Sequence, residues 1–305
     1  MHFFCQRGTS GDRGCERTSD REKSKIPSFK RRGFFAHWLI RTIEILDLSF
    51  SSPRTYSQNN AKMGCGVLMK AEFATAIIPA RFNSTRFPGK PLVEIDGKTL
   101  IEHVYRRVEQ ADLVSDIVVA TDDKRIADAV ERFGGTVAMT RGDHPSGTDR
   151  LAEAAQEFPN DALIVNVQGD EPMIDPGDID RAIEAASLRD AEIVTLMTPL
   201  DPAQADDPNR VKVVTDKNGI ALYFSRTKIP SGGTYSLHLG LYVYRVGFLK
   251  KFTKLERTPL EISERLEQLR ALEHGYRIRV VEVESESFGI DTPEDLEQWI
   301  KSSSS

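Results

Sequence analysis

The chain has 305 residues, of which 39% are apolar and 29% are charged, and its formal net charge at pH 7 is −5. This length allows one large domain or two smaller ones, and the composition is that of a soluble globular protein. No run of 18 apolar residues occurs, which excludes a membrane-spanning helix, and we expect no membrane partner.

The first 70 residues differ in charge from the rest of the chain. They hold 13 basic and 6 acidic residues, which leaves 28 basic and 40 acidic residues for the remainder. An acidic body argues against nucleic acid as a partner. All three cysteines (Cys5, Cys15 and Cys65) lie in the basic segment, so the body has neither a disulfide framework nor a cysteine nucleophile. This usage is typical of a reducing compartment, and we expect a cytoplasmic protein.

We interpret residues 1–70 as an N-terminal extension, either disordered or ahead of a true translation start at Met63 or Met69. Six acidic residues weaken the alternative of an organellar transit peptide. Residues 71–305 are expected to form one catalytic domain, with a smaller sheet over about residues 200–245.

From Phe73 onward, predicted strands and helices alternate in the α/β manner, which favours a mixed sheet flanked by helices. The predicted strands are Thr75–Pro79, Asp116–Asp122, Thr136–Met139, Ala162–Val167, Glu192–Met197, Val211–Thr215, Ile220–Phe224, Leu237–Arg245 and Ile278–Val283. The predicted helices are Leu100–Glu109, Lys124–Phe133, Gly147–Phe158, Ile179–Ala186, Leu260–Glu273 and Pro293–Ile300, the last one capped by Thr292.

The loop after the first strand carries three cations, Arg81, Arg86 and Lys90. Ligands of open α/β sheets bind outside the carboxyl ends of the strands, so this loop suits an anionic ligand. The alternative is an ordinary solvated cation cluster. Neither GxxxxGK[ST] nor GxGxxG is present, which disfavours a P-loop kinase and a Rossmann dehydrogenase.

Two acidic segments are candidate ligands for a metal. Asp170 and Glu171, in the sequence QGDEP, directly follow a predicted buried strand, and Asp291 precedes the last predicted helix. A carboxylate beside a polyphosphate site is a typical ligand of Mg²⁺. Helix capping is the alternative explanation for the acids of QGDEP.

Two further groups of polar residues are candidates for substrate contacts. Ser146, Gly147 and Thr148 lie at a predicted helix start, where they either contact a base or ribose or simply cap the helix. His238 and Tyr242 share one face of a predicted strand, and such residues are often only the edge of a core.

The motifs PAR, STRFPGKPL, VATDD, MTR, HPSGTDR, VNVQGDEP, ALYFSR, HLGLYVYR, LEQLR and DTPEDLE occur in this order from Pro79 to Glu297. Together they resemble the 3-deoxy-manno-octulosonate (Kdo) cytidylyltransferase family, and the resemblance covers the chain from about Phe73 to its end. It implies a nucleotidyltransferase fold, usually dimeric, that joins CTP to Kdo with Mg²⁺ and gives CMP-Kdo, which feeds lipopolysaccharide assembly, and pyrophosphate.

The resemblance also implies roles for individual residues. Arg81 and Lys90 hold the triphosphate and, with Asp170, form the catalytic set, while Ala80 contacts the nucleotide. Asp170 and Asp291 ligate the metal. The cytidine is placed near Arg141, Ser146 and Gly147, and the sugar near Gln168, Arg226, His238, Tyr242, Glu267 and Gln268. Kdo carries a carboxylate, and Arg226 and His238 are its expected partners.

One segment departs from the family pattern. Only Thr227–Leu237 separate the SR of ALYFSR from the HLG strand, where many relatives have a longer loop. This leaves open a related acidic sugar such as 8-amino-Kdo. A non-catalytic nucleotide-binding protein is the non-enzyme alternative.

Overall fold

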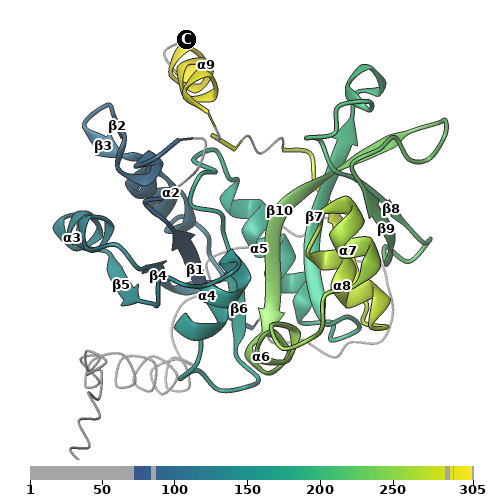
Figure 1. The fold of residues 1–305 in the computed structure, drawn as a ribbon, viewed down its shortest axis with the longest axis horizontal. Helices are drawn as coiled ribbons and strands as arrows, with labels where there is room; N and C mark the ends of the chain where they lie inside the picture. The colour runs from purple at the N-terminus through teal and green to yellow at the C-terminus, as the bar shows by residue number, and fades with distance from the viewer. Residues whose placement is uncertain (1–71, 84–86, 286–288, 291, 304–305) are drawn as a thin grey trace, which may run out of the picture. The chain divides into compact units, whose positions relative to one another are not determined.

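A nine-stranded mixed sheet organises the part of the chain that the computed structural model describes, residues 72–83, 87–285, 289–290 and 292–303 (Figure 1). The main strand order is β11-β7-β10-β6-β1-β4-β5. Central β1 pairs in parallel with β4 and β6, whereas β10 is antiparallel to β6 and β7. The predictions for residues 1–70, for Arg86 and for Asp291 lie outside the described residues. The predicted mixed α/β class is confirmed.

The strands are β1 (Ala74–Ala80), β2 (Glu94–Ile95), β3 (Lys98–Thr99), β4 (Val114–Thr121), β5 (Thr136–Met139), β6 (Leu163–Asn166), β7 (Ile193–Leu200), β8 (Lys212–Thr215), β9 (Ala221–Ser225), β10 (Tyr235–Arg245) and β11 (Ile278–Glu282). The helices are α2 (Leu100–Val108), α3 (Lys124–Arg132), α4 (Gly147–Ala154), α5 (Pro176–Ala186), α6 (Val246–Phe252), α7 (Pro259–Glu264), α8 (Gln268–Glu273) and α9 (Pro293–Ser303), with 3-10 turns η1 (Lys90–Leu92) and η2 (Pro202–Gln204).

Strand β1 is buried on both faces, as its continuous apolar sequence requires. Its even-numbered residues share one core with the apolar sides of α2, α3 and α5. Thr75 and Ile77, which point the other way, are also buried, and α4 contacts β1 and α6. The strand extends one residue beyond Pro79, to Ala80. Its last residues pair with β4 alone, because the pairing with β6 stops at Ile77.

Side-chain caps set the starts of several helices. Thr99 accepts a hydrogen bond from the Glu102 amide at the start of α2, and Asp175 caps α5 ahead of Pro176. The expected cap of the last helix is present, because the Asp295 amide donates to Thr292 Oγ1. These polar residues stand where the sequence predicted helix starts.

The single helix predicted over Leu260–Glu273 is wrong. Arg265 adopts the left-handed conformation, with φ of 56°, and divides the segment into α7 and α8. The Arg265 and Leu266 amides both donate to the Glu261 carbonyl, which closes α7. Because the break directly precedes them, Glu267 and Gln268 lie at the start of α8 instead of mid-helix.

The predicted hairpin of residues 211–224 is present as β8 and β9. It does not form a separate sheet, because Lys212 of β8 pairs with Leu237 of β10. Figure 1 shows α7 and α8 beside this hairpin, and contacts join α8 to β9. Within the described ranges, no helix combines the length and the apolar character needed to cross a membrane.

Candidate active site

The carboxyl ends of β1 and β6 bring together the two stretches singled out in the sequence. Lys90 Nζ lies 2.7 Å from Asp170 Oδ2 and donates to the Ile290 carbonyl at 2.6 Å. The Lys90 side chain is 10% exposed and the Asp170 side chain 30%. The predicted phosphate cation and the predicted metal acid therefore form one ion pair.

Gly169 makes this approach possible. A Cβ atom at this position would lie 2.9 Å from the Pro79 carbonyl oxygen, closer than real contacts allow. The absence of a side chain thus lets the QGDEP segment lie against the end of β1. The Ile290 amide also donates to the Asp170 carbonyl, which ties the segment before α9 to the same place.

Arg81 holds the loop that leads into α4. Its Nη2 atom donates to the His144 carbonyl at 2.9 Å and to the Ser146 carbonyl at 2.8 Å. Ser146 caps α4 by accepting from the Asp149 amide, so the capping interpretation of this residue is confirmed. Ala80 is buried at the end of β1. Together these contacts place the start of α4 against the loop that follows β1. This loop carries Arg81 and Lys90 and is called the phosphate loop below, after its predicted ligand.

The other two residues predicted near the cytidine differ in their surroundings. Gly147 begins α4, and its Cβ position is 3.9 Å from Pro79, an ordinary contact distance. The Arg141 side chain is 68% exposed, with Asp143 and Glu153 at 3.7 and 3.9 Å. Arg141 is therefore a surface cation at the outer side of the loop.

Strand β10 carries two of the six residues predicted near the sugar, His238 and Tyr242. It has a bulge between Leu239 and Tyr242, opposite β7. Gln168 Nε2 donates to the Gly240 carbonyl at 3.3 Å, and Glu171 Oε1 lies 3.2 Å from the Gly240 Cβ position. The QGDEP segment thus contacts β10 at the bulge.

His238 lies beside the bulge, and its ring is uncharged because it is buried. Thr195 Oγ1 donates to the Leu241 carbonyl at 2.8 Å and lies 3.0 Å from His238 Nε2. Because the single hydroxyl proton is used, we infer that Nε2 carries a proton and donates to Thr195. The ring packs against Phe224 and Tyr242, and burial lowers the pKa of His238 to about 3. His238 is neutral at physiological pH.

Arg226 braces the fold through most of its polar groups. Its Nε donates to the Glu264 carbonyl at 2.9 Å and its Nη1 to the Pro208 carbonyl at 3.0 Å. Its backbone amide donates to the Glu264 carboxylate. The expectation that Arg226 and His238 would be a natural pair of partners for a sugar carboxylate is thus weakened, because one is engaged by backbone carbonyls and the other is uncharged.

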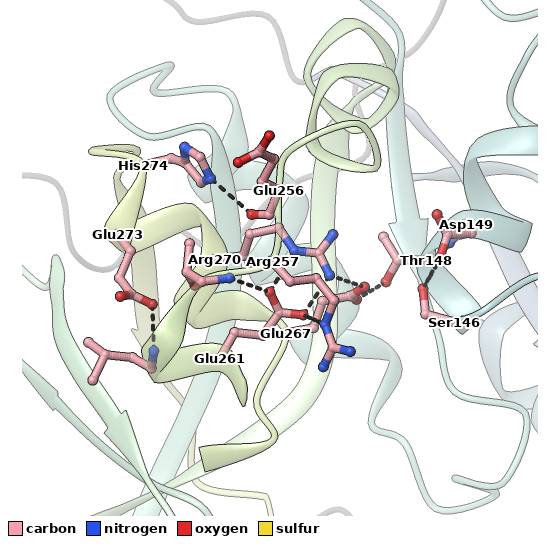
Figure 2. Close-up of polar contacts among 12 residues, drawn as sticks. Ser146, Thr148, Asp149, Glu256, Arg257, Glu261, Glu267, Arg270, Glu273 and His274 are labelled. Atoms are coloured by element: carbon pink, nitrogen blue, oxygen red, sulfur yellow. Dashed lines mark hydrogen bonds and ion pairs between the residues drawn. The ribbon is translucent and has the colours of Figure 1, made fainter. Parts of the chain in front are cut away.

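Glu267 and Gln268 lie at the start of α8, and Gln268 is 6% exposed. The Glu267 carboxylate accepts a hydrogen bond from the Thr148 hydroxyl at the start of α4 (Figure 2). Burial raises the pKa of Tyr242, and the negative charges of Glu267 and Glu171 add to that effect. The α4 start, α8 and β10 therefore converge around Glu267.

Sequence reasoning missed an ion pair between α4 and the end of β4, in which the arginine is buried. Arg150 is fully buried in α4; its Nη2 lies 3.0 Å from Asp122 Oδ1, and its Nη1 donates to Thr140. Burial lowers the pKa of Arg150, and the nearby Arg81 charge acts in the same direction. Both partners occur in quoted motifs, VATDD and HPSGTDR, but strand-end acids and helix arginines are usually exposed.

The described residues place one of the two predicted metal ligands. Among residues 72–83, 87–285, 289–290 and 292–303, no group of three or more histidine, cysteine or acidic side chains could hold a metal ion. Mg²⁺ commonly uses only one or two protein carboxylates and fills its other positions with water and phosphate oxygens. Asp170, a partly exposed oxygen donor at the phosphate loop, fits that requirement.

Comparison with known proteins agrees with this geometry. A sequence profile of the cytidylyltransferase family matches residues 75–279. The 3-deoxy-manno-octulosonate cytidylyltransferase of Syntrophotalea carbinolica is 55% identical over 239 residues, which cover 73% of this chain and 95% of that protein. The chain belongs to the 3-deoxy-manno-octulosonate cytidylyltransferase family. Its resemblance to that family, and the nucleotidyltransferase activity the family implies, are therefore confirmed.

Solved structures agree with membership in the cytidylyltransferase family. CMP:2-keto-3-deoxy-manno-octonic acid synthetase complexed with CTP matches with a TM-score of 0.73 and 41% identity, over 76% of this chain and 99% of that one. A putative glucose-1-phosphate thymidylyltransferase from Bacillus anthracis matches with a TM-score of 0.54 at 18% identity, over 75% of this chain and 94% of that one, and shows the shared fold alone.

Proposed function

We propose that this cytidylyltransferase transfers CMP from CTP to Kdo and releases pyrophosphate. Its relatives carry this activity in their names, and a structural relative was solved with CTP. The observation that carries the proposal here is the Lys90–Asp170 pair at the carboxyl edge of the sheet, next to Arg81. This arrangement suits a polyphosphate and not an uncharged ligand.

The reaction would require little covalent work from the protein. The anomeric hydroxyl of Kdo attacks the α-phosphorus of CTP, the bond to the β-phosphate oxygen breaks, and pyrophosphate leaves. Lys90 and Arg81 would stabilise the charge that develops on the departing pyrophosphate. Two backbone carbonyls position Arg81, and Asp170 contacts Lys90, so both cations lie at this edge of the sheet.

We propose Mg²⁺ as the metal, with Asp170 as one ligand and Asp291, which lies outside the described residues, as the second. When bound, the ion would polarise the phosphoryl group and orient the substrates. Lys90 contacts Asp170 at 2.7 Å, so the cation and the proposed metal ligand would both lie beside the triphosphate.

On the sugar side we propose Gln168, Arg226, His238, Tyr242, Glu267 and Gln268 as the contacting residues. A neutral His238 whose Nε2 proton is committed to Thr195 offers Nδ1 as an acceptor for a sugar hydroxyl. The Arg226 Nε and Nη1 atoms donate to backbone carbonyls, so its Nη2 atom would be the one to contact the Kdo carboxylate. On the nucleotide side we propose Ala80, Arg141, Ser146 and Gly147.

Further proposals follow from family membership. We propose that the product serves lipopolysaccharide assembly, that the enzyme is cytoplasmic and that it is a homodimer. Leu222 of β9 and Leu260 and Ile262 of α7 are large apolar side chains exposed in the single chain, and a subunit contact could cover them. Sedimentation of the wild type and of an Ile262→Glu variant would test the dimer.

Pyrophosphate release tests the proposed reaction. The assay contains CTP and Mg²⁺ with Kdo, with its 8-amino analogue, or without sugar. Release with Kdo supports the proposal, whereas release chiefly with the analogue assigns the specificity to another acidic sugar and points to the short segment Thr227–Leu237. No release with any sugar would leave a nucleotide-binding protein.

A further inference from the structure

The Glu267 carboxylate is contacted by two helices, α4 through Thr148 and α8 through Arg270. One carboxylate oxygen, Oε2, accepts from the Thr148 hydroxyl, and the other, Oε1, lies 3.4 Å from Arg270 Nη2. Figure 2 shows these contacts in a continuous row, from Thr148 of α4 through Glu267 to Arg270 of α8. Thr148 and Glu267 are 119 positions apart in the sequence, so this row depends on the tertiary fold.

Arg270 is itself fixed by a buried carboxylate. Its Nε and Nη2 atoms donate to the two oxygens of Glu261 at 2.8 and 2.6 Å, a two-point arrangement that sets the plane of the guanidinium. Glu261 is 4% exposed and also completes the capping box with Thr258 at the start of α7. Arg270 therefore has one available orientation, in which Nη2 faces Glu267.

The position of Thr148 is fixed by the start of α4. It is 6% exposed and is the second residue of α4, directly after the loop whose carbonyls accept from Arg81. Its hydroxyl thus reaches Glu267 from a helix start that is tied to the phosphate loop. A contact formed by two rigid elements favours one position of the carboxylate.

We propose that Thr148 and Arg270 are positioning residues, which hold the Glu267 carboxylate ionised and oriented toward the sugar side of the site. The inference rests on the proposed function, because it assigns Glu267 to the Kdo site. Neither Thr148 nor Arg270 is placed in contact with substrate. Their role is exerted through Glu267 alone.

The charge of Glu267 depends on these neighbours. Burial raises the pKa of Glu267, while the Thr148 hydroxyl, the Arg270 guanidinium and the Ser146 side chain lower it. The titratable and charged groups that face Glu267 are Asp149 of α4, Arg270 of α8, and Tyr242 and Tyr244 of β10. The Thr148 hydroxyl is one of the groups that lower the pKa of Glu267. Without it the effect of burial is less compensated, so Glu267 would take up a proton at higher pH.

The test compares Thr148→Val with Thr148→Ser, which keeps the hydroxyl, and with Thr253→Val as the matched control. Among the described residues, the hydroxyl of Thr253, the C-cap of α6, makes one hydrogen bond, at 3.4 Å to the Lys250 carbonyl. For Thr148→Val we expect the KM for Kdo to rise about tenfold with a smaller change in kcat, because a hydrogen bond to a charged group is lost. The acid limb of kcat/KM for Kdo should move to higher pH, and the serine variant should restore it.

A double-mutant cycle separates positioning from general destabilisation. In a Glu267→Gln background, Thr148→Val should add little, because the group on which it acts has already changed. Arg270→Lys should shift the pH profile in the same direction, with folding checked by circular dichroism. An unchanged acid limb in Thr148→Val, or an equal effect in both backgrounds, would overturn the inference. If the wild type releases no pyrophosphate with Kdo, the proposed function fails first.

Discussion

Lys90 and Asp170 are 80 positions apart in the sequence, yet the ammonium and carboxylate lie 2.7 Å apart at the carboxyl edge of the sheet. The contact joins the loop after β1 to the segment after β6. The cation proposed to contact the triphosphate thus lies against the proposed ligand of the metal.

Replacing Asp170 should abolish most of the turnover and preserve the fold. We expect Asp170→Ala to lower kcat by about a hundredfold or more, because a preorganised charged contact at the phosphate is lost. Its melting temperature should stay within about 5 °C of the wild type, since Lys90 retains its hydrogen bond to the Ile290 carbonyl. Asp128→Ala, which removes an exposed ion pair with Lys124 in α3, is the control. Near-normal turnover of Asp170→Ala would disprove the role of Asp170.

Gly169 should not tolerate a methyl group. Gly169→Ala places Cβ 2.9 Å from the Pro79 carbonyl, so the QGDEP segment must shift. We expect a loss of about 1–3 kcal/mol in the free energy of unfolding, together with reduced activity, because overpacking displaces backbone. Gly232→Ala, where nothing lies within 4 Å of the Cβ position, should leave the free energy of unfolding unchanged. Urea denaturation compares the two variants, and equal stability would contradict the predicted clash.

Thr195 should control the hydrogen bonding of His238. Thr195→Val removes the hydroxyl that accepts from Nε2, and we expect a loss of about 1–3 kcal/mol in stability because a buried donor is left without its partner. The KM for Kdo should rise as the ring loses its fixed orientation. Thr195→Ser retains the hydroxyl and should behave nearly as the wild type. Identical KM values for all three proteins would show that the ring orientation is irrelevant to sugar binding.

His238 should make stability depend on pH in the acid range. Because its pKa is about 3 in the folded protein, unfolding below about pH 6.5 is accompanied by proton uptake at this ring. Its contribution to stability is complete above pH 6.5 and is lost as the pH falls toward 3. His238→Gln should flatten the fall in unfolding free energy between pH 7 and pH 5. Parallel curves for the two proteins would mean that the folded ring titrates normally.

Local patterns in the sequence predicted most of the fold. Thr136–Met139 is the strand β5 to the residue. Lys90 and Asp170 each follow a predicted strand, and the parallel pairing of β1 with β6, which the sequence did not indicate, brings these two strand ends together. The break at Arg265 was not predictable from residue types, because the left-handed position carries arginine where glycine is usual.

Contacts between distant segments account for the parts of the site that the sequence did not indicate. Thr148 and Glu267 meet only through tertiary packing, and nothing in either motif specifies the other. Arg226 was expected to face a sugar carboxylate because of its charge, yet backbone carbonyls of Pro208 and Glu264 accept from its guanidinium. A cation in a motif does not by itself reveal whether the fold or a ligand uses it.

Phosphorus NMR of a mixture of the protein, CTP, Mg²⁺ and Kdo tests the central claim most directly, since it observes the products themselves. We predict that CTP resonances are replaced by those of pyrophosphate and of a phosphodiester, the CMP-sugar, in equal amounts, and that Asp170→Ala forms both at least about a hundredfold more slowly. Hydrolysis to CMP and pyrophosphate without a phosphodiester, or an unchanged CTP spectrum, would contradict the assignment of this site to CMP transfer.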